Sequence, residues 1–204
     1  LWNGGPTPTI SLPPGSSAIG LGDTANSATV AVPGLVAWYR GEGNANDSAG
    51  TDNGTANGAT TTAGEVGLAL AFDGKSSSVS IPDEAALDAP TFTVGGWFNP
   101  ASAPASGQLA VLASKYDGNW HGWYLWLDSG LHPVFSLRQS PTSNIEVSSP
   151  TPVSLDAWSH LTAAYDGHTA SLYIDGTLVA SKALPSGYAP SAGAMTLGVA
   201  SWYP

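Results

Sequence analysis

The chain has 204 residues, of which 42% are hydrophobic, a length typical of one domain with its own core. Only 10% of the residues are charged, and fifteen acidic against five basic residues give a formal net charge of −10. Such a surface repels phosphate backbones and anionic lipids, and no apolar run is long enough for a membrane-spanning helix. Cysteine is absent, which excludes disulfides and thiolate chemistry. We therefore expect no nucleic-acid partner and no membrane insertion.

Residues 1–33 are rich in proline and small residues and have no helical periodicity, so we expect an extended N-terminal arm or linker. A disordered tail would have the same composition. Within the arm, residues 28–32 have enough β-branched character to pair with a strand. The chain begins at Leu1 and its only methionine is Met195, so we expect a processed piece of a longer precursor.

From residue 34 to residue 204, short alternating apolar runs are separated by turn residues, which predicts an all-β domain with an antiparallel sandwich or barrel. No segment has a convincing helical period, and the closest is a single turn at 82–87. The predicted strands are 35–40, 68–72, 77–81, 92–98, 109–115, 122–127, 132–138, 145–148, 159–165, 170–174, 177–182 and 195–199.

Four Asp-Gly pairs lie between these runs. A type I′ hairpin turn needs positive φ at both central residues, which aspartate tolerates and glycine adopts freely. We therefore predict tight hairpin turns at each pair, with the aspartates as turn formers first. The pairs are Asp73-Gly74, Asp117-Gly118, Asp166-Gly167 and Asp175-Gly176.

Because side chains alternate across a strand, the apolar residues can be assigned to one face, which we expect to form the core. They are Phe92, Val94, Phe98, Trp123, Leu125, Leu127, Phe135, Leu137, Leu161, Ala163, Tyr165, Leu172 and Ile174. The opposite face of the same strands mixes aromatic rings with hydrogen-bonding groups. Its members are Trp97, Tyr124, Trp126, Arg138, His160 and Tyr173.

This second face is the candidate ligand-binding surface. Flat aromatic rings stack on the apolar faces of sugars, while arginine, histidine and tyrosine supply directed hydrogen bonds. Trp120 and His121, in the loop 117–121, are expected to be better exposed and to contact a ligand at the rim. A loop or another domain that covers these rings would leave the same pattern, so plain packing is the alternative explanation.

The loop 41–54 gathers several oxygen donors with free backbone carbonyls. Hard oxygen ligands suit Ca²⁺ better than a transition metal, although the spacing does not match a helix-loop-helix calcium loop. A turn-rich loop held by Asx hydrogen bonds would look the same. The candidate metal ligands are Glu42, Asp47, Asp52 and Asn53, with Asn44 beside them.

Catalysis has no positive support in the sequence. No predicted strand carries two acids on one face, as a glycosidase pair of carboxylates requires. The four histidines lack metal-type spacing, and no G-x-S-x-G nucleophile elbow is present. We therefore expect a protein that is not an enzyme.

Four stretches occur in an order typical of a known family: GLVAWYRGEGNANDSAGTDNGT, LAFDGKSSSVSIPD, FTVGGWFNP and WSHLTAAYDGHTASLYIDGTLVAS. From about residue 34 onward the chain resembles the bacterial laminin-G-like domain of the concanavalin A-like superfamily. The resemblance implies a two-sheet jelly roll, an extracellular setting, frequent Ca²⁺ at the rim, and roles in carbohydrate recognition or adhesion. It also implies that Trp97, Tyr124 and His160 lie on the strands of one curved, sugar-facing sheet.

Two family features are missing. The E-x-D-x-x-E signature of the laminarinase relatives has no match in this sequence. Members also usually close with a strand similar to G-x-I-D-E-V-R-I-Y, which pairs near the first strand, and no such motif precedes Pro204. We therefore expect an open sheet edge that invites strand addition from another protein chain, and a weaker case for calcium, since the motif carries an aspartate associated with that ion.

The sequence thus predicts a secreted or cell-surface, non-catalytic module that binds a polysaccharide or glycan or mediates adhesion. The first alternative is a structural subunit of an extracellular assembly or filament, in which the arm 1–33 fills the open edge of its own chain or of a neighbour. The second alternative is a glucanase-like glycoside hydrolase.

Overall fold

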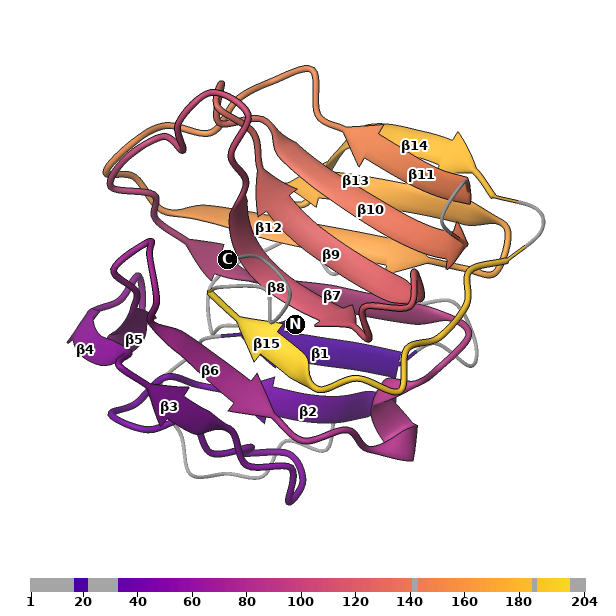
Figure 1. Ribbon diagram of the computed structural model, residues 1–204. Helices are drawn as coiled ribbons and strands as arrows, with labels where there is room; N and C mark the ends of the chain where they lie inside the picture. Colours follow the sequence, from indigo (N-terminus) through magenta and orange to yellow (C-terminus); the bar gives the residue numbers. More distant parts are fainter. Residues whose placement is uncertain (1–16, 22–32, 141–142, 185–186, 199–204) are drawn as a thin grey trace.

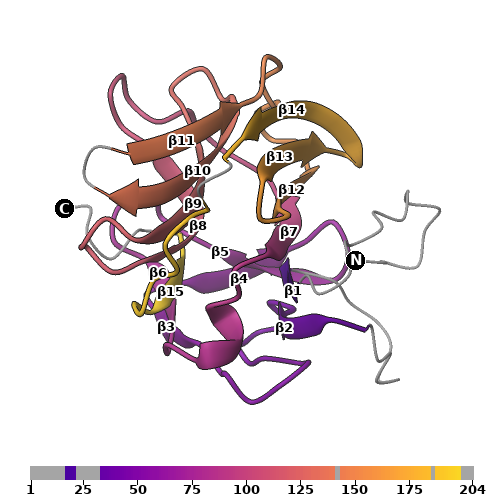
Figure 2. The same cartoon turned by 90° about the vertical axis from the view of Figure 1, so that its right-hand side faces the viewer.

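The computed structural model describes residues 17–21, 33–140, 143–184 and 187–198, and the statements below concern these. Almost all the ordered secondary structure is β, arranged as two sheets that face each other (Figures 1 and 2). The predicted all-β sandwich is therefore confirmed. In this part of the chain, no helix has the length and apolarity needed to span a bilayer.

One layer is a six-stranded sheet with the order β14-β13-β12-β7-β1-β2. Its strands, in that order, are Thr177–Ala183, Thr169–Ile174, Ser159–Tyr165, Phe92–Phe98, Ser17–Leu21 and Leu35–Tyr39. The other layer is a seven-stranded sheet with the order β11-β10-β9-β8-β15-β6-β3. Its strands, in that order, are Ser143–Ser148, Pro133–Ser140, Gly122–Leu127, Ala110–Tyr116, Met195–Leu197, Ser78–Ile81 and Thr55–Asn57.

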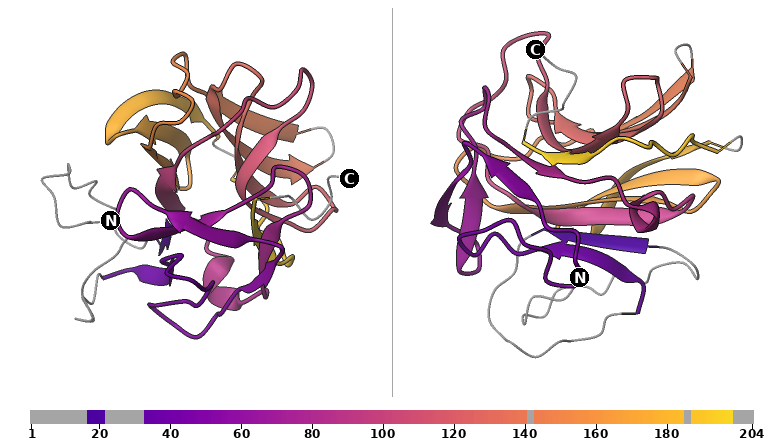
Figure 3. Two further views of the ribbon diagram at one scale, coloured as in Figure 1. Left: turned by 90° about the vertical axis from the view of Figure 1, so that its left-hand side faces the viewer. Right: turned by 60° about the horizontal axis from the view of Figure 1, so that its bottom comes forward.

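Two small elements complete the described structure. A hairpin of β4 (Thr60–Ala63) and β5 (Leu68–Ala71) lies at one end of the sandwich (Figure 3). A short 3-10 helix, η1 (Ala85–Leu87), occupies the segment where the sequence predicts at most one turn. Strands β1, β3 and β4 were not predicted, because each is short and lacks an alternating apolar pattern.

The core lies between the two sheets and contains the predicted apolar face. Trp123 is 1% exposed, and its ring centre lies 5.5 Å from that of Phe92. Phe92 in turn contacts Phe135 edge to face at 6.0 Å. Phe98 and Ile174 are partly buried against this cluster rather than inside it. The alternation rule therefore assigned the inner faces of both sheets correctly.

Strand β1 fills a slot one strand wide between β7 and β2 (Figure 1). It runs parallel to both neighbours, with Ile19 opposite Val94 on β7 and opposite Ala37 on β2. Every other strand pairing in the described structure is antiparallel. The N-terminal arm thus contributes a strand to the sandwich, through residues 17–21. The pairing predicted for residues 28–32 lies outside the described residues.

A buried lysine near the end of the central strand β8 holds several loops at that end of the seven-stranded sheet together. Lys115 on β8 points inward and is only 1% exposed. Its ammonium group forms ion pairs with Asp83 and with Asp88, the latter at 2.6 Å. It also donates to the carbonyl oxygens of Ser191 at 2.6 Å and Gly193 at 2.9 Å. The oxygen cage supplies the compensation that a buried charge requires.

The hairpin prediction is correct for three Asp-Gly pairs, which join β8 to β9, β12 to β13 and β13 to β14, and wrong for Asp73-Gly74, which joins strands of different sheets. The type I′ geometry occurs at one pair. Asp175 and Gly176 both have positive φ, as a type I′ turn requires. At the other three pairs only the glycine has positive φ, and the aspartate side chain accepts backbone N–H bonds from residues two to four positions later. These are Asx turns, so the aspartate side chain, and not its backbone, shapes the loop. The three pairs are Asp73-Gly74, Asp117-Gly118 and Asp166-Gly167.

Candidate functional site

The predicted ligand-binding residues divide between two opposite surfaces. Trp97, His160 and Tyr173 lie on the six-stranded sheet, whereas Tyr124 lies on the seven-stranded sheet. The expectation that Trp97, Tyr124 and His160 share one sheet is therefore wrong. Side-chain alternation sorts residues into inner and outer faces, but it does not say which of two stacked sheets a strand joins.

Four of the predicted residues lie on or beside the outer face of the seven-stranded sheet, and we call them the Trp120 cluster: Trp120, Tyr124, Trp126 and Arg138. Arg138 contacts Trp120 and Tyr124 directly, and Trp126 follows Tyr124 two positions later on the same face of β9. The guanidinium carbon of Arg138 lies 5.1 Å from the ring centre of Trp120 and 5.6 Å from that of Tyr124. Arg138 also donates from Nε and Nη2 to the Tyr124 hydroxyl, at 3.1 and 2.6 Å. These contacts hold the guanidinium plane against two rings, a geometry that favours cation–π attraction.

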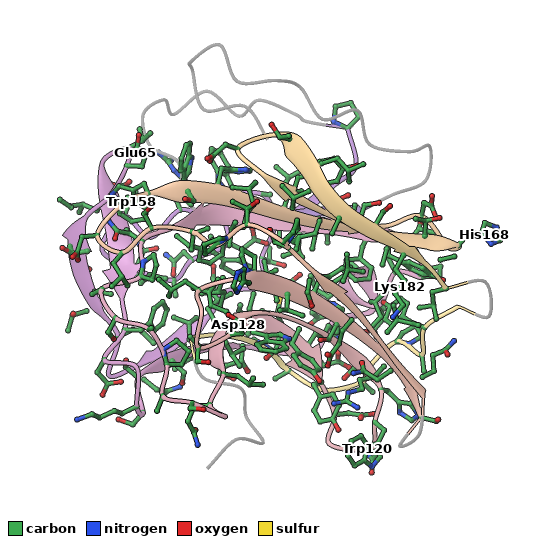
Figure 4. The ribbon with its side chains drawn as sticks, turned by 90° about the horizontal axis from the view of Figure 1, so that it is seen from above. Glu65, Trp120, Asp128, Trp158, His168 and Lys182 are labelled. Carbon is green, nitrogen blue, oxygen red and sulfur yellow. The ribbon has the colours of Figure 1, made fainter. Side chains whose placement is uncertain are left out.

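Trp120 is the exposed member of the cluster. Its side chain is 39% exposed and lies at the periphery of the molecule, away from the space between the sheets (Figure 4). Its backbone has φ +68°, a left-handed conformation that costs a non-glycine residue roughly 1–2 kcal/mol. Such strain persists only where the surroundings impose it, and it concentrates at functional sites.

The loop before β9 explains how Trp120 is held. Asp117 accepts backbone N–H bonds from Asn119 at 2.7 Å and from His121 at 3.4 Å, and its second carboxylate oxygen lies 2.8 Å from Nδ1 of His121. Partial burial raises the pKa of Asp117, but these hydrogen bonds outweigh it and lower that pKa overall. The carboxylate therefore stays ionised and clamps both sides of Trp120.

Tyr124 is the buried member of the cluster, at 2% exposure. Burial raises the pKa of its hydroxyl, while the neighbouring Arg138 works in the opposite direction. Tyr116 meets its ring edge to face at 6.4 Å. Tyr124 thus forms the base of the cluster and positions Arg138, whereas Trp120 offers the accessible surface.

An in-register row of polar side chains crosses all seven strands of the sheet on its outer face. Each neighbour in the row is a directly paired residue, and on every strand except the exposed β3 the row residue is adjacent to a core residue. The row runs Thr55, Ser80, Thr196, Ser114, Tyr124, Ser136 and Glu146. Sequence reasoning missed these hydroxyls, because they become a row only when the strand order and register are known.

The side chain of Trp126 is hydrogen-bonded to one residue of this row. Its indole Nε1 donates to the hydroxyl of Ser136 at 3.0 Å, and the indole is partly buried. Ser136 is 0% exposed and Ser114 2%, so the middle of the row forms a polar floor beneath the aromatic side chains. The directional bond to Ser136 sets the orientation of the Trp126 ring.

The second predicted group occupies the outer face of the six-stranded sheet. Trp97 and His160 are paired across β7 and β12, and their rings meet edge to face at 5.2 Å. His160 Nδ1 lies 3.3 Å from the Thr162 hydroxyl, and burial lowers the pKa of the His160 ring, which favours its neutral form. Tyr173 lies opposite Thr162 on the next strand. These residues form a separate, partly buried group.

The candidate metal ligands are engaged mainly in holding their own loop. Asp47 Oδ1 accepts the backbone N–H of Trp38 and Ala49, and the side-chain oxygen of Asn53 accepts the backbone N–H of Asp47 at 2.9 Å. Glu42 accepts the N–H of Leu68 on the β4–β5 hairpin at 3.2 Å. The Asx-turn alternative therefore describes most of this loop.

One carboxylate oxygen of the loop, Asp47 Oδ2, differs from the others in its hydrogen bonding. Asp47 is 7% exposed, and its Oδ2 has no hydrogen-bond partner. The Asp52 backbone carbonyl accepts the Tyr39 hydroxyl at 2.8 Å. In the part of the chain that the structure describes, no three histidine or acidic side chains gather as a metal-binding group. The four predicted ligands thus do not form a ready-made ion site.

A family model described as the concanavalin A-like lectin/glucanases superfamily, Laminin_G_3, matches residues 73–204. The chain belongs to this superfamily. The two stacked sheets agree with that membership, and the resemblance seen in the sequence motifs is confirmed. No curated protein matches the sequence significantly.

Solved structures of other proteins share the fold at low sequence identity. Domain 4 of AbnA, a GH43 extracellular arabinanase from Geobacillus stearothermophilus solved with arabinotriose, has a TM-score of 0.63 and 18% identity, over 79% of this chain and 81% of that chain. The binding domain of botulinum neurotoxin DC, solved with SialylT, has a TM-score of 0.55 and 16% identity, over 74% of this chain and 39% of that chain. At these identities the likeness shows the fold alone.

Proposed function

We propose that this protein is a non-catalytic, extracellular carbohydrate-binding or adhesion module that contacts its glycan through the Trp120 cluster. The observation that carries the proposal is the exposed, strained Trp120 stacked on Arg138 and supported by Tyr124. An exposed ring beside a fixed hydrogen-bond donor is the combination that sugar recognition uses. Two proteins of the same fold were solved with saccharides, which makes a glycan the first ligand to test.

The test is calorimetric or electrophoretic binding to a panel of soluble polysaccharides and oligosaccharides. We expect Trp120→Ala to weaken binding about tenfold or more, because truncating an aromatic residue that anchors a ligand costs about 2 kcal/mol or more and a tenfold loss corresponds to about 1.4 kcal/mol. Leu178→Ala is the matched control, since Leu178 is a 53% exposed apolar side chain on β14 in the other sheet. Equal affinity of both variants, or hydrolysis of β-glucans by the wild type, would remove the proposal.

Calcium at Glu42, Asp47, Asp52 and Asn53 remains a separate proposal, supported by the unpaired, buried Oδ2 of Asp47. A bound cation would raise the melting temperature by mass action. The test compares the melting temperatures of the wild type and of Asp47→Asn, each measured in Ca²⁺ and in a chelator. A Ca²⁺-dependent rise confined to the wild type supports the site, and identical melting in both solutions rejects it.

A second candidate function is that of a structural subunit in an extracellular assembly, and strand β1 favours it. The slot between β7 and β2 accepts a strand that is parallel on both sides, a pairing slightly less stable than an antiparallel one. Thirteen residues separate Leu21 from Leu35, so the arm can fill its own slot or that of a neighbour. Strand exchange of this kind is a known route to assemblies.

Light scattering after size exclusion distinguishes an arm that fills the slot of its own chain from an arm that fills the slot of a neighbour. Exchange predicts concentration-dependent dimers or longer assemblies in the intact chain, and their loss in a chain that lacks residues 1–21. A monomer at all concentrations would leave β1 as an intramolecular strand and exclude the assembly role.

A further inference from the structure

We infer that the Trp120 cluster selects saccharides that carry a carboxylate, such as those built from uronic acids, and that Arg138 binds that carboxylate. The inference rests on the proposed function and deepens it by naming the ligand class.

The guanidinium group of Arg138 has more N–H donors than its hydrogen bonds to Tyr124 use. A guanidinium group carries five N–H donors, and Arg138 uses Nε and Nη2 toward a single acceptor, the Tyr124 hydroxyl. No carboxylate of the described residues lies within 4.0 Å of it, since the ion pairs found there involve Lys115, His121 and His132. Its remaining N–H groups are therefore available to a ligand.

Arg138 places a positive charge on the outer face of a sheet in a strongly acidic protein. The whole chain carries a net charge of −10, and only two basic residues occur in the seven strands of this sheet. Lys115 is buried and paired with two carboxylates, so Arg138 is the one basic residue of these strands that lies on the outer face. Glu146, on the same face, accepts a hydrogen bond from Asn144 at 2.7 Å rather than from Arg138.

The geometry suits a planar anion. The two rings fix the guanidinium plane, which reduces the conformational entropy lost when a ligand binds. A carboxylate accepts two parallel N–H bonds from such a fork, and a charge-assisted bond of this kind is about twice as strong as a neutral one. The exposed Trp120 ring beside it is placed to stack on the sugar that carries the acid group.

The experiment compares acidic oligosaccharides with their methyl esters. The probes are oligogalacturonides and oligoglucuronides, the same chains with esterified carboxyls, neutral oligosaccharides of equal length and sulfated ones. We expect wild-type protein to bind at least one acidic series about tenfold or more tightly than its ester, and to lose affinity as salt increases. Arg138→Gln removes that difference, and Arg138→Lys restores only part of it, because lysine lacks the fork.

The wild-type comparison needs no variant, so it decides the question even where a substitution at Arg138 disturbs folding. Three results would each overturn the selection for carboxylates. The first is equal affinity of the wild type for an acidic saccharide and its ester, and the second is binding of neutral saccharides or of sulfated ones alone. The third is that Arg138→Gln loses the same amount of affinity for the acidic saccharide as for its ester. Those results would leave the glycan-binding role standing. Absence of binding to every saccharide in the panel would instead reject both proposals.

Discussion

At the scale of single residues, the site and its support depend on positions that violate simple rules. Trp120 has a left-handed backbone, although a bulky residue rarely adopts one. Lys115 is a charged residue inside the sandwich, where lysine is almost never found without partners. Each exception is explained by what surrounds it: the Asp117 clamp in the first case and the cage of oxygens in the second.

The strain at Trp120 can be measured with two substitutions. Trp120→Gly and Trp120→Ala both remove the indole and its contact with Arg138, but only glycine adopts φ +68° without strain. We expect the glycine variant to be more stable than the alanine variant by about 1 kcal/mol in urea unfolding. Greater stability of the alanine variant would mean that the loop does not hold this conformation in solution.

Loss of the Lys115 side chain should weaken the end of the seven-stranded sheet, where its ammonium group holds the loops together. Lys115→Met leaves Asp83 and Asp88 facing each other without the shared ammonium group. Removing one partner of a buried pair costs roughly 3–5 kcal/mol, and since both carboxylates are about one-third exposed we expect about 2 kcal/mol. Lys182→Met, on exposed β14, is the control and should change the free energy of unfolding by less than about 0.5 kcal/mol. Similar values for the two variants would contradict the role of the cage.

At the scale of elements, alternation predicted most strands but not their partners. The strands β7, β9 and β12 have the predicted bounds, because each alternates clearly and ends at turn residues. Short strands such as β1 and β3 have no such pattern, and they exist because a neighbouring edge supplies hydrogen bonds. The sequence offered an arm that could fill an open sheet edge, whereas the pairing of residues 17–21 with β2 and β7 required the structure.

Strand β1 makes a prediction about stability that two truncations can test. A chain without residues 1–16 keeps β1, while a chain without residues 1–21 exposes the facing edges of β7 and β2. We expect the first to unfold at about the denaturant concentration of the intact chain, and the second to lose on the order of 3 kcal/mol, from unsatisfied backbone groups at about 1 kcal/mol each. Equal stability of the two truncations would show that β1 is not part of the folded sheet.

At the scale of the whole molecule, the fold was readable from the sequence and the site only in part. Composition, turn residues and motif order suffice for a two-sheet sandwich, because the period-two pattern determines which side of each strand is buried. The sequence also named all four members of the Trp120 cluster. It could not separate them from Trp97 and His160 on the opposite surface, nor reveal the row through Ser136, since both depend on strand order and register.

We expect the ligand to contact the seven-stranded sheet at Trp120 and not the six-stranded sheet at Trp97. The most direct measurement is a ¹H–¹⁵N NMR titration that follows the indole N–H signals of the eight tryptophans, assigned by single Trp→Phe substitutions, during addition of a bound oligosaccharide. Binding at the Trp120 cluster should move the signals of Trp120 and Trp126, which should saturate together, while the signal of Trp97 stays in place. Movement of Trp97 with Trp120 unchanged would contradict this expectation.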